Sequence, residues 1–523
     1  MSNSGIVLLN ARILTMDRDF PLAEAVVTPD DRITYVGDRK GLGEGLIYGK
    51  ELIDLGGRTV VPGFIDSHVH LVEMAKSRLG LDLGGCRSIK EALDIVEQGL
   101  ERRPRGEWVI GYNWDESRWK EGRIVTIEEL DRVSPHHPVI LKRICQHLVL
   151  VNSRALELAR IPKGTEGLCT DPKTGNPNGI IQQDARRIVE SHLKFSPQKL
   201  YAAIETTQKE MLALGITSIH DMGSDFRLLQ RVSNEGRLVI RTHLYVEEHA
   251  LSDIDGVGGA LRDEDNCHFR IGGVKFFLDG SIGAHSAALS EPYADGRGGC
   301  GRLRWDKDAL KSLVSKLHEK GWQVSLHAIG DRAVTMALEV LEHAQNGCPR
   351  KASRHRIEHC ELLPEGALEQ IKNLGVIVSA QPNFSSMWGR PGGMYEKLLG
   401  KRRWEGVDPW GIFHSRSIPL AFGSDGMPVG PLYGIWSAAN HPVEESRLGP
   451  LDALRSYTHG SAFASFEEDV KGTIAQGKLA DMVVLSRDPT AIPRKEIKDI
   501  KVEMTILGGK VLHDNLSQRV SSY

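Results

Sequence analysis

Two histidines end an apolar run near the start of the chain, and their spacing would suit a metal ion. The run begins at Val60, and His68 and His70 stand two residues apart at its end. Residues two apart on an extended strand point the same way, so both imidazoles can reach one point. Neutral imidazole is a ligand of zinc and related ions. The pair alone is equally typical of two hydrogen-bonded histidines at a strand end.

Four further polar residues stand at the ends of apolar, strand-like runs: Lys275, His327, His359 and Asp425. Each has an ordinary alternative when taken alone. A histidine can be hydrogen-bonded in a core, an aspartate can cap a helix, and a buried lysine can pair with a carboxylate. Their shared placement at strand ends favours one common site, with the make-up of a metal centre.

The elements that would position these residues alternate between strands and helices. Helical patterns such as 308–320, 333–344 and 364–373 lie between the strand-like runs. Eight such units predict a (β/α)8 TIM barrel, in which the carboxyl ends of the strands share one site. An open doubly wound sheet is the rival fold. The eight runs are Val60–Ile65, Gly215–Ile219, Leu238–Val246, Phe269–Phe277, Trp322–Leu326, Arg354–Ile357, Val376–Ala380 and Ile418–Phe422.

The rest of the α/β chain divides around this barrel. Residues 1–60 and 470–523 read as short strands, and we expect them to form one composite β-sandwich because neither end buries a core alone. The barrel then covers 61–70 and 196–469. Residues 71–195 are too long for a loop and predict an inserted α/β subdomain that caps the active site.

Aromatic residues of this insert have two interpretations. Trp108, Trp114, Trp119 and His147 could wall a substrate pocket. Alternatively, the tryptophans pack the insert's own core, which we expect for at least two of them.

Composition excludes several classes of protein. The 523 residues are 40% hydrophobic and 26% charged, with a net charge of -3, as in a soluble globular protein. No basic cluster predicts nucleic-acid binding, and no apolar run is long enough to span a membrane. The 7 cysteines are scattered and the N-terminus lacks a signal-peptide pattern, so we expect reduced thiols and a cytoplasmic protein.

Five stretches that contain the candidate residues resemble, in order along the chain, the motifs of the amidohydrolase superfamily. The second, third and fourth of these stretches, together with 477–481, are similar to the branch typified by N-substituted formamide deformylase. The resemblance covers nearly the whole chain and implies a barrel with a composite sandwich, in a metal-dependent hydrolase of amide or related C–N bonds. The stretches are 61–70, 274–281, 326–333, 356–359 and 423–425.

The resemblance also implies roles for the candidate residues. His68 and His70 would bind the more buried metal beside Asp425. His327 and His359 would bind a second metal or, around a single metal, supply one ligand and one substrate contact. The metal is a divalent ion, with zinc favoured by the histidine-rich set and iron, manganese or nickel as alternatives.

Lys275 resembles a lysine that carries a carbamate bridging two metals in many relatives. Such a carboxylated lysine is an anion that can ligate, whereas an ammonium would repel the ions. The alternative for Lys275 is an unmodified lysine oriented toward the substrate.

A hydrolytic mechanism follows from this set. Zinc-type ions lower the pKa of bound water to about 7. Asp425 would act as the general base and later pass the proton to the leaving nitrogen. His359 or His327 would stabilise the oxyanion if it does not bind metal. Weaker candidates for substrate contact are His147, His220, His285 and Gln381.

Rival functions stay open at this point. The same site could hydrolyse an ester or a lactone or deaminate a ring, because activated water does not select the electrophile. A catalytically silent binding protein would lack ligands, and none is missing here. We expect a small-molecule substrate as the partner, with a homodimer as an open alternative.

Overall fold

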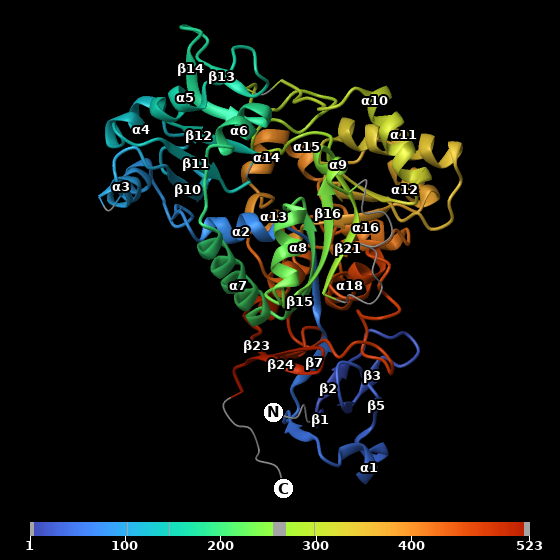
Figure 1. Cartoon of the computed structure of the whole chain (residues 1–523). Coiled ribbons are helices and arrows are strands. Elements are labelled where there is room, and N and C mark those ends of the chain that lie inside the picture. The colour runs from blue at the N-terminus through green and yellow to red at the C-terminus, as the bar shows by residue number, and fades with distance from the viewer. Residues whose placement is uncertain (1–4, 102, 146, 255–267, 298, 517–523) are drawn as a thin grey trace. The chain divides into compact units, whose positions relative to one another are not determined.

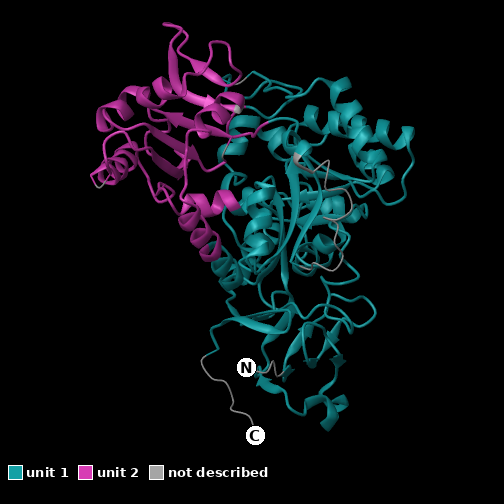
Figure 2. Cartoon of the chain, viewed as in Figure 1, with its two compact units in different colours: residues 1–71, 207–279, 286–523 teal, residues 72–206, 280–285 magenta. Residues whose placement is uncertain are grey.

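The computed structural model describes residues 5–101, 103–145, 147–254, 268–297 and 299–516. The chain forms two compact units (Figure 2). The first contains residues 1–71, 207–279 and 286–523, and the second contains residues 72–206 and 280–285. Among the described residues, no helix is both long and apolar enough to cross a membrane.

Eight parallel strands form the centre of the first unit (Figure 1), and their order in the sheet follows their order in the chain. The last strand returns to the first, since the Asp425 amide donates to the His68 carbonyl across 2.7 Å. This curled sheet with its helices confirms the predicted TIM barrel. The strands are β8 (Phe64–Val69), β15 (Ile216–Met222), β16 (Arg241–Glu247), β17 (Phe269–Phe277), β18 (Gln323–Ala328), β19 (Arg356–His359), β20 (Ile377–Ala380) and β21 (Leu420–Phe422).

The helices between these strands begin at ordinary caps. The side chain of Asp306 accepts from the amides of Asp308 and Ala309 at the start of α10, and the side chain of Asp225 accepts from the Leu228 amide at the start of α8. The helices of this unit include α8 (Phe226–Asn234), α10 (Lys307–Glu319), α11 (Asp331–Gly347), α12 (Ala367–Leu374), α13 (Pro382–Trp388), α16 (Trp410–Ser415), α17 (Pro431–Ala439), α18 (Pro450–Ser456) and α19 (His459–Ala464).

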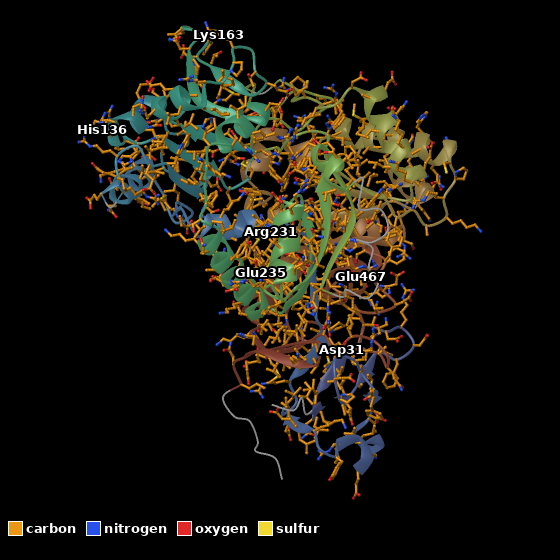
Figure 3. The ribbon with its side chains drawn as sticks, viewed as in Figure 1. Asp31, His136, Lys163, Arg231, Glu235 and Glu467 are labelled. Atoms are coloured by element: carbon orange, nitrogen blue, oxygen red, sulfur yellow. The ribbon has the colours of Figure 1, made fainter. Side chains whose placement is uncertain are left out.

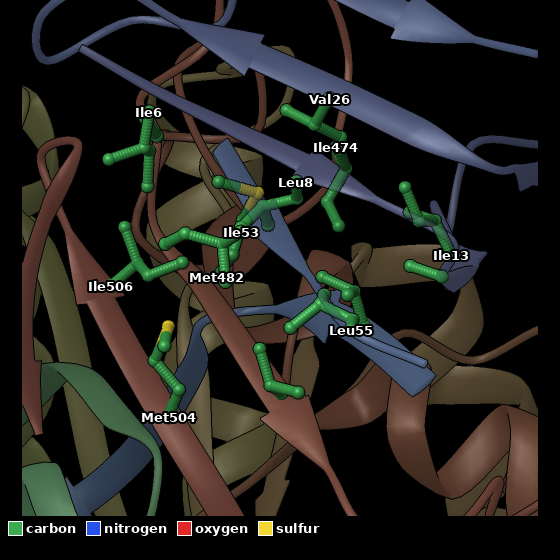
Figure 4. Packing of buried hydrophobic residues seen from close by; sticks show 14 of the residues in the cluster. Ile6, Leu8, Ile13, Val26, Ile53, Leu55, Ile474, Met482, Met504 and Ile506 are labelled. Atoms are coloured by element: carbon green, nitrogen blue, oxygen red, sulfur yellow. The ribbon is translucent and has the colours of Figure 1, made fainter. Parts of the chain in front are cut away.

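Strands from both chain ends form two further sheets in the same unit. One is ordered β5-β4-β1-β6 and the other β24-β23-β22-β7-β2-β3. Isoleucines, leucines and methionines from both sheets pack into one core (Figure 4). The strands are β1 (Ile6–Leu9), β2 (Arg12–Leu14), β3 (Leu22–Ala23), β4 (Ala25–Thr28), β5 (Tyr35–Gly37), β6 (Glu51–Asp54), β7 (Thr59–Pro62), β22 (Met482–Leu485), β23 (Val502–Leu507) and β24 (Lys510–Asp514).

The first predicted barrel strand, Val60–Ile65, is wrong in its bounds. The chain changes sheets at Gly63. The Gly63 amide donates to the backbone carbonyl of Asp481 in the sandwich, whereas the Phe64 amide donates to the backbone carbonyl of Gly215, just before β15. A Cβ on Gly63 would lie 2.2 Å from the Thr217 hydroxyl oxygen, so only glycine fits this close crossing. A single apolar run thus supplies β7 to the sandwich and β8 to the barrel.

An ion pair joins the sandwich to the barrel. Arg241 at the start of β16 donates to both carboxylate oxygens of Asp481, from Nε at 2.7 Å and from a terminal nitrogen at 3.0 Å. The Gly508 amide donates to the same carboxylate across 2.8 Å. Both charged side chains are buried, so this bidentate pair is well shielded from salt.

The second unit has its own mixed sheet, ordered β13-β14-β12-β11-β10-β9. Trp114 and Trp119 lie in its hydrophobic core, with ring centroids 5.8 Å apart, and Trp114 donates to the Leu141 carbonyl. These two tryptophans therefore pack the insert's core. The unit contains β9 (Leu81–Asp82), β10 (Val109–Trp114), β11 (Val139–Arg143), β12 (Leu148–Val151), β13 (Leu168–Thr170), β14 (Pro177–Gln182), α3 (Ile89–Leu100), α4 (Ile127–Val133), α5 (Ser153–Ala159) and α6 (Gln183–Glu190).

Candidate metal centre

Three of the predicted residues meet at the carboxyl ends of the barrel strands. His68, His359 and Asp425 each offer a donor atom, and these atoms all lie within 4.8 Å of one another. The two histidines at the end of β8 turn to the same carboxylate. Asp425 Oδ1 lies 3.7 Å from His68 Nε2 and 3.2 Å from His70 Nε2. The i, i+2 spacing thus places two imidazoles around one oxygen.

The backbone is strained at two members of this cluster. His359 has a φ of 69° and Asp425 a φ of 53°, in the left-handed region that side chains with a Cβ rarely adopt. Around His359 the Cys360 amide donates to the Glu358 carbonyl across 3.0 Å, which closes a tight γ-turn. This turn ends the alternation of side-chain directions along β19, so the side chains of the consecutive residues Glu358 and His359 both approach His68.

Glu358 fixes the orientation of His68. Its Oε2 lies 2.7 Å from His68 Nδ1, and its Oε1 accepts from the Ser325 hydroxyl across 2.7 Å. Burial opposes ionisation of this carboxyl, but the adjacent Arg356 guanidinium holds its pKa well below the usual range. The ionised carboxylate accepts a hydrogen bond from the Nδ1–H of His68, so the Nε2 lone pair of His68 is left to face Asp425.

Asp66 supports the same strand end. It accepts from the His68 amide across 3.2 Å and from the Ser424 amide and hydroxyl across 2.9 and 2.6 Å. It therefore ties the first barrel strand to the segment that carries Asp425. Burial raises the pKa of Asp66 to about 7, against the lowering effect of these hydrogen bonds.

Arg356 is the centre of a buried network beneath the cluster. Its guanidinium donates to the Ser67 carbonyl at 2.7 Å, to the Ser379 hydroxyl at 2.8 Å and to Glu358 at 2.7 Å. It also lies 2.8 Å from His220 Nδ1. One arginine thus joins four barrel strands below the candidate metal ligands.

His220 was expected at the mouth of the barrel, and the structure places it elsewhere. β15 continues to Met222, so His220 lies inside the barrel, fully buried beside Arg356. Its ring is 5.4 Å from that of His243, and His243 Nδ1 is 3.8 Å from a carboxylate oxygen of Glu467. Glu467 is labelled among the side chains in Figure 3. Burial lowers the pKa of His220 well below its usual value. His220 belongs to the supporting network.

Lys275 and His359 each have a buried nitrogen that lacks a hydrogen-bond partner among the described residues. Lys275 Nζ and His359 Nδ1 make no hydrogen bond within the described part of the chain. Burial lowers the pKa of the Lys275 ammonium to about 8, and the nitrogen lies 5.1 Å from the centre of the Phe277 ring. Buried polar groups normally have partners. Orphaned nitrogens beside converging imidazoles and a carboxylate fit a site built to hold a cation.

His327 lies next to the cluster of His68, His359 and Asp425 but is not one of its three members. Its ring centroid is 4.5 Å from that of His359, and its Nε2 is 3.5 Å from Asp279 Oδ1. The carboxyl of Asp279 accepts from three backbone amides, those of Ala288, Ile329 and Gly330. Burial nevertheless raises the pKa of Asp279 to about 7. Asp279 therefore anchors the loop that follows His327.

The remaining expected substrate contacts are placed differently. Gln381 follows β20 and is the N-cap residue of α13, and its Oε1 is buried with no hydrogen-bond partner among the described residues. Its Nε2 donates to the Ser379 carbonyl across 3.0 Å. His147 and His285 are half-buried residues of the second unit. Substrate contact by His147, His285 or Gln381 stays a prediction.

An aromatic row begins beside His359. The Phe384 ring is nearly parallel to the His359 ring, at 6.0 Å and 15°. Trp388 follows at 5.0 Å from Phe384, and Tyr395 at 6.3 Å from Trp388. We call Phe384, Trp388 and Tyr395 the aromatic wall.

Sequence reasoning gave no role to Glu358, Arg356 or Asp66. A signal for them exists. Arg356 and Glu358 are charged residues two apart inside a short buried strand, and Asp66 stands two residues before His68. The i, i+2 rule that selected the histidine pair therefore also selects these supporting residues.

Comparisons with known proteins agree with this architecture. The model of the amidohydrolase family matches residues 51–513. The YtcJ protein of Bacillus subtilis (strain 168) is 30% identical over 96% of this chain and 98% of its own length. N-substituted formamide deformylase of Arthrobacter pascens is 26% identical over 97% of this chain and 98% of its own. An uncharacterized metal-dependent hydrolase from Pyrococcus furiosus has a TM-score of 0.74 at 31% identity, covering 93% of this chain and 99% of that structure.

Proposed function

The chain belongs to the amidohydrolase family, and from that premise we propose that it is a metal-dependent hydrolase of a carbon–nitrogen bond in a small amide, N-formyl or cyclic-amide substrate. One observation carries the proposal: His68, His359 and Asp425 offer donor atoms that lie within 4.8 Å of one another. The left-handed backbone at His359 and Asp425 supports it, because such strain clusters where function requires a particular geometry.

The cation would be held by His68, His359 and Asp425, with His70 as a further donor beside the carboxylate. An imidazole-rich set with one carboxylate suits zinc. When bound, such a cation polarises a carbonyl oxygen and makes water a stronger nucleophile. His327 and Lys275 stand next to this set and would complete a second metal position.

Lys275 would carry a carbamate in an enzyme with two metals. Its Nζ makes no hydrogen bond to any residue that the structure describes, and its lowered pKa leaves more of the neutral amine that attacks carbon dioxide. The ammonium first loses one proton; the nitrogen of the neutral amine then bonds to the carbon of carbon dioxide and loses a second proton, so that a cation becomes an anion. Carbon NMR after incubation with isotope-labelled bicarbonate tests this step. No labelled signal would leave Lys275 as an unmodified residue facing the substrate.

Asp425 would be the general base. Burial alone would raise the pKa of its carboxyl, but the hydrogen bond with His70 and the neighbouring imidazoles lower it below the usual range. The ionised group can accept a proton from the attacking water and pass it to the leaving nitrogen. His327 or His359, whichever does not hold the cation, would face the developing oxyanion.

The experiment pairs metal analysis of the purified chain with a hydrolysis screen of N-formyl amines, N-acyl amino acids, cyclic amides and matched esters. We expect bound divalent metal, and turnover that is lost with chelator and restored by zinc. Asp425→Asn should keep most metal and lose turnover by about 100- to 10,000-fold. The matched control is Asp452→Asn on α18, since that carboxylate pairs with Arg455 away from the cluster.

Two outcomes would contradict this function. A chain with no bound metal and no rescue by zinc would remove the metal from the mechanism. Near-normal turnover of Asp425→Asn would remove the carboxylate from its role as base. Turnover confined to the esters would keep the metal chemistry and replace the amide as the substrate.

A further inference from the structure

The second unit contains a cavity of about 1090 Å³. Its lining comes from four segments of that unit: the β9 edge of the sheet, the end of α3, the residues that lead into β10, and the segment between α6 and α7 (Pro197–Ala213). His68, His359 and Asp425 do not line it. Small-molecule sites are typically cavities of about 300–1,000 Å³ with apolar walls and few polar groups. The cavity is therefore large enough for a ligand that does not contact the candidate metal cluster.

An aromatic pair lines this cavity and is accessible from it. The ring centroids of Trp108 and His192 lie 6.2 Å apart with their planes at 26°. The Trp108 side chain is half-buried and His192 is exposed, so neither ring is covered completely by the protein. Leu81 and Ile95 add half-buried aliphatic side chains to the lining. Because aromatic rings favour offset or edge-to-face contact with another ring, this surface suits a planar aromatic group.

Two ammonium groups of the lining have no carboxylate partner within the described ranges. Lys194 and Lys199 are both exposed, and neither forms an ion pair there. Arg103 differs from them, because its guanidinium lies 3.6 Å from the Glu107 carboxylate. Glu101 is the other carboxylate of the lining. Two lysines against this one acid leave the cavity with an excess of positive charge.

The surroundings of the cavity also favour an anionic ligand over a cationic one. Lys76 Nζ already lies 5.6 Å from the centre of the Phe195 ring, which is another part of the lining. A second cation would be repelled by this ammonium and by the two lysines. The helix α7 begins beside Lys199 and has no acidic residue in its first turn, so its positive end adds to the same field.

We propose that this cavity is a second ligand site, which binds a planar aromatic carboxylate. The ring lies against Trp108 and His192, and the carboxylate pairs with Lys194 and Lys199. This inference goes beyond the proposed function, because it involves neither the metal nor hydrolysis. Exposed ion pairs contribute little individually, so contact with the rings supplies most of the affinity and the lysines supply the preference for an anion.

The test is calorimetry of the metal-loaded full-length chain with naphthalene-2-carboxylate and with 2-naphthalenemethanol, a neutral alcohol with the same ring. We expect the carboxylate to bind more tightly than the alcohol by about three- to tenfold. The double variant Lys194→Gln, Lys199→Gln should lose this preference and bind the alcohol as the wild type does. Lys163→Gln is the matched control and should change neither affinity, since Lys163 (labelled in Figure 3) is an exposed lysine of the same unit outside the lining.

A second variant tests the contact with the rings. Trp108→Ala should weaken the binding of both compounds by about tenfold. Melting temperature identifies a variant that has failed to fold, and His192→Ala then replaces it because His192 is exposed. Glu101→Gln should strengthen binding of the carboxylate alone.

Two results would overturn the inference. The first is equal affinity of the wild type for the carboxylate and the alcohol. The second is a preference for the carboxylate that persists in the double lysine variant and disappears with chelator, because the compound would then bind at the metal centre. A chain that hydrolyses no amide in the screen would still give the expected affinities here, so the two proposals fail separately.

Discussion

Replacing Glu358 with glutamine should weaken metal binding without removing any candidate ligand. The carboxylate lies 2.7 Å from His68 Nδ1, and its charge increases the basicity of the other ring nitrogen, which faces Asp425. Glutamine is nearly the same size, but it is neutral. Loss of such a supporting carboxylate typically costs about 10- to 100-fold in metal affinity.

The same change should also reduce stability, because Arg356 would lose its buried counter-ion. Arg356 donates to Glu358 at 2.7 and 3.1 Å, and neither side chain is exposed. Removing one partner of a buried ion pair costs about 3–5 kcal/mol. The remaining bonds of Arg356 to Ser67 and Ser379 would persist, so we place the loss at the lower end of that range.

The assay is competition for zinc against a calibrated chelator, with urea unfolding in parallel. Glu467→Gln is the matched control. It removes a buried carboxylate that pairs with Lys471 at 2.9 Å but does not contact His68. It should lower stability and leave zinc affinity unchanged. If Glu358→Gln binds zinc within twofold of the wild type, Glu358 does not tune His68 and the reasoning is refuted.

Three other changes test the frame of the molecule. Burial opposes ionisation of Asp481, but the Arg241 guanidinium lowers its pKa; stability from this pair is therefore complete above the ordinary carboxyl pKa of about 3.9 and lost as pH falls through the lower folded value. In Asp481→Asn, the free energy of unfolding measured with urea should depend less on pH across this acid range. An unchanged dependence on pH would contradict the assignment. Trp114→Phe removes the 3.0 Å bond to Leu141 and should cost about 1–3 kcal/mol in urea unfolding of the second unit, with metal content unchanged; altered metal content would argue against a structural role. Gly63→Ala places a Cβ 2.2 Å from the Thr217 hydroxyl oxygen and should cost about 1–3 kcal/mol by thermal unfolding; a neutral result would mean that β7 and β8 can separate locally.

The barrel was predictable because its strands are buried on both faces and stand out as apolar runs. β17 (Phe269–Phe277) has the predicted bounds. The approach of His68, His359 and Asp425 follows from their positions at strand ends. The prediction of strands from apolar runs succeeded because strands of a parallel sheet are buried on both faces and are therefore apolar along their length.

The errors arose where a tertiary contact decides the outcome. The second strand was expected to end at Ile219, which placed His220 at the mouth. Instead β15 continues to Met222 by pairing with β16, and the buried His220 contacts Arg356. The break between β7 and β8 depends on Thr217, more than 150 residues away. The γ-turn that brings His359 to His68 uses a left-handed backbone that no propensity favours for histidine in a strand.

The hydrogen bond from Asp425 to His68 joins the first barrel strand to the segment after the last one. The histidines of the candidate metal centre, His68 and His70, are therefore synthesised long before its carboxylate, Asp425. A ribosome adds about 5–20 residues per second, so His68 and His70 wait for many seconds before Asp425 emerges. Metal binding at the proposed centre would therefore come late, after the barrel is finished, and would not guide the early folding of the chain.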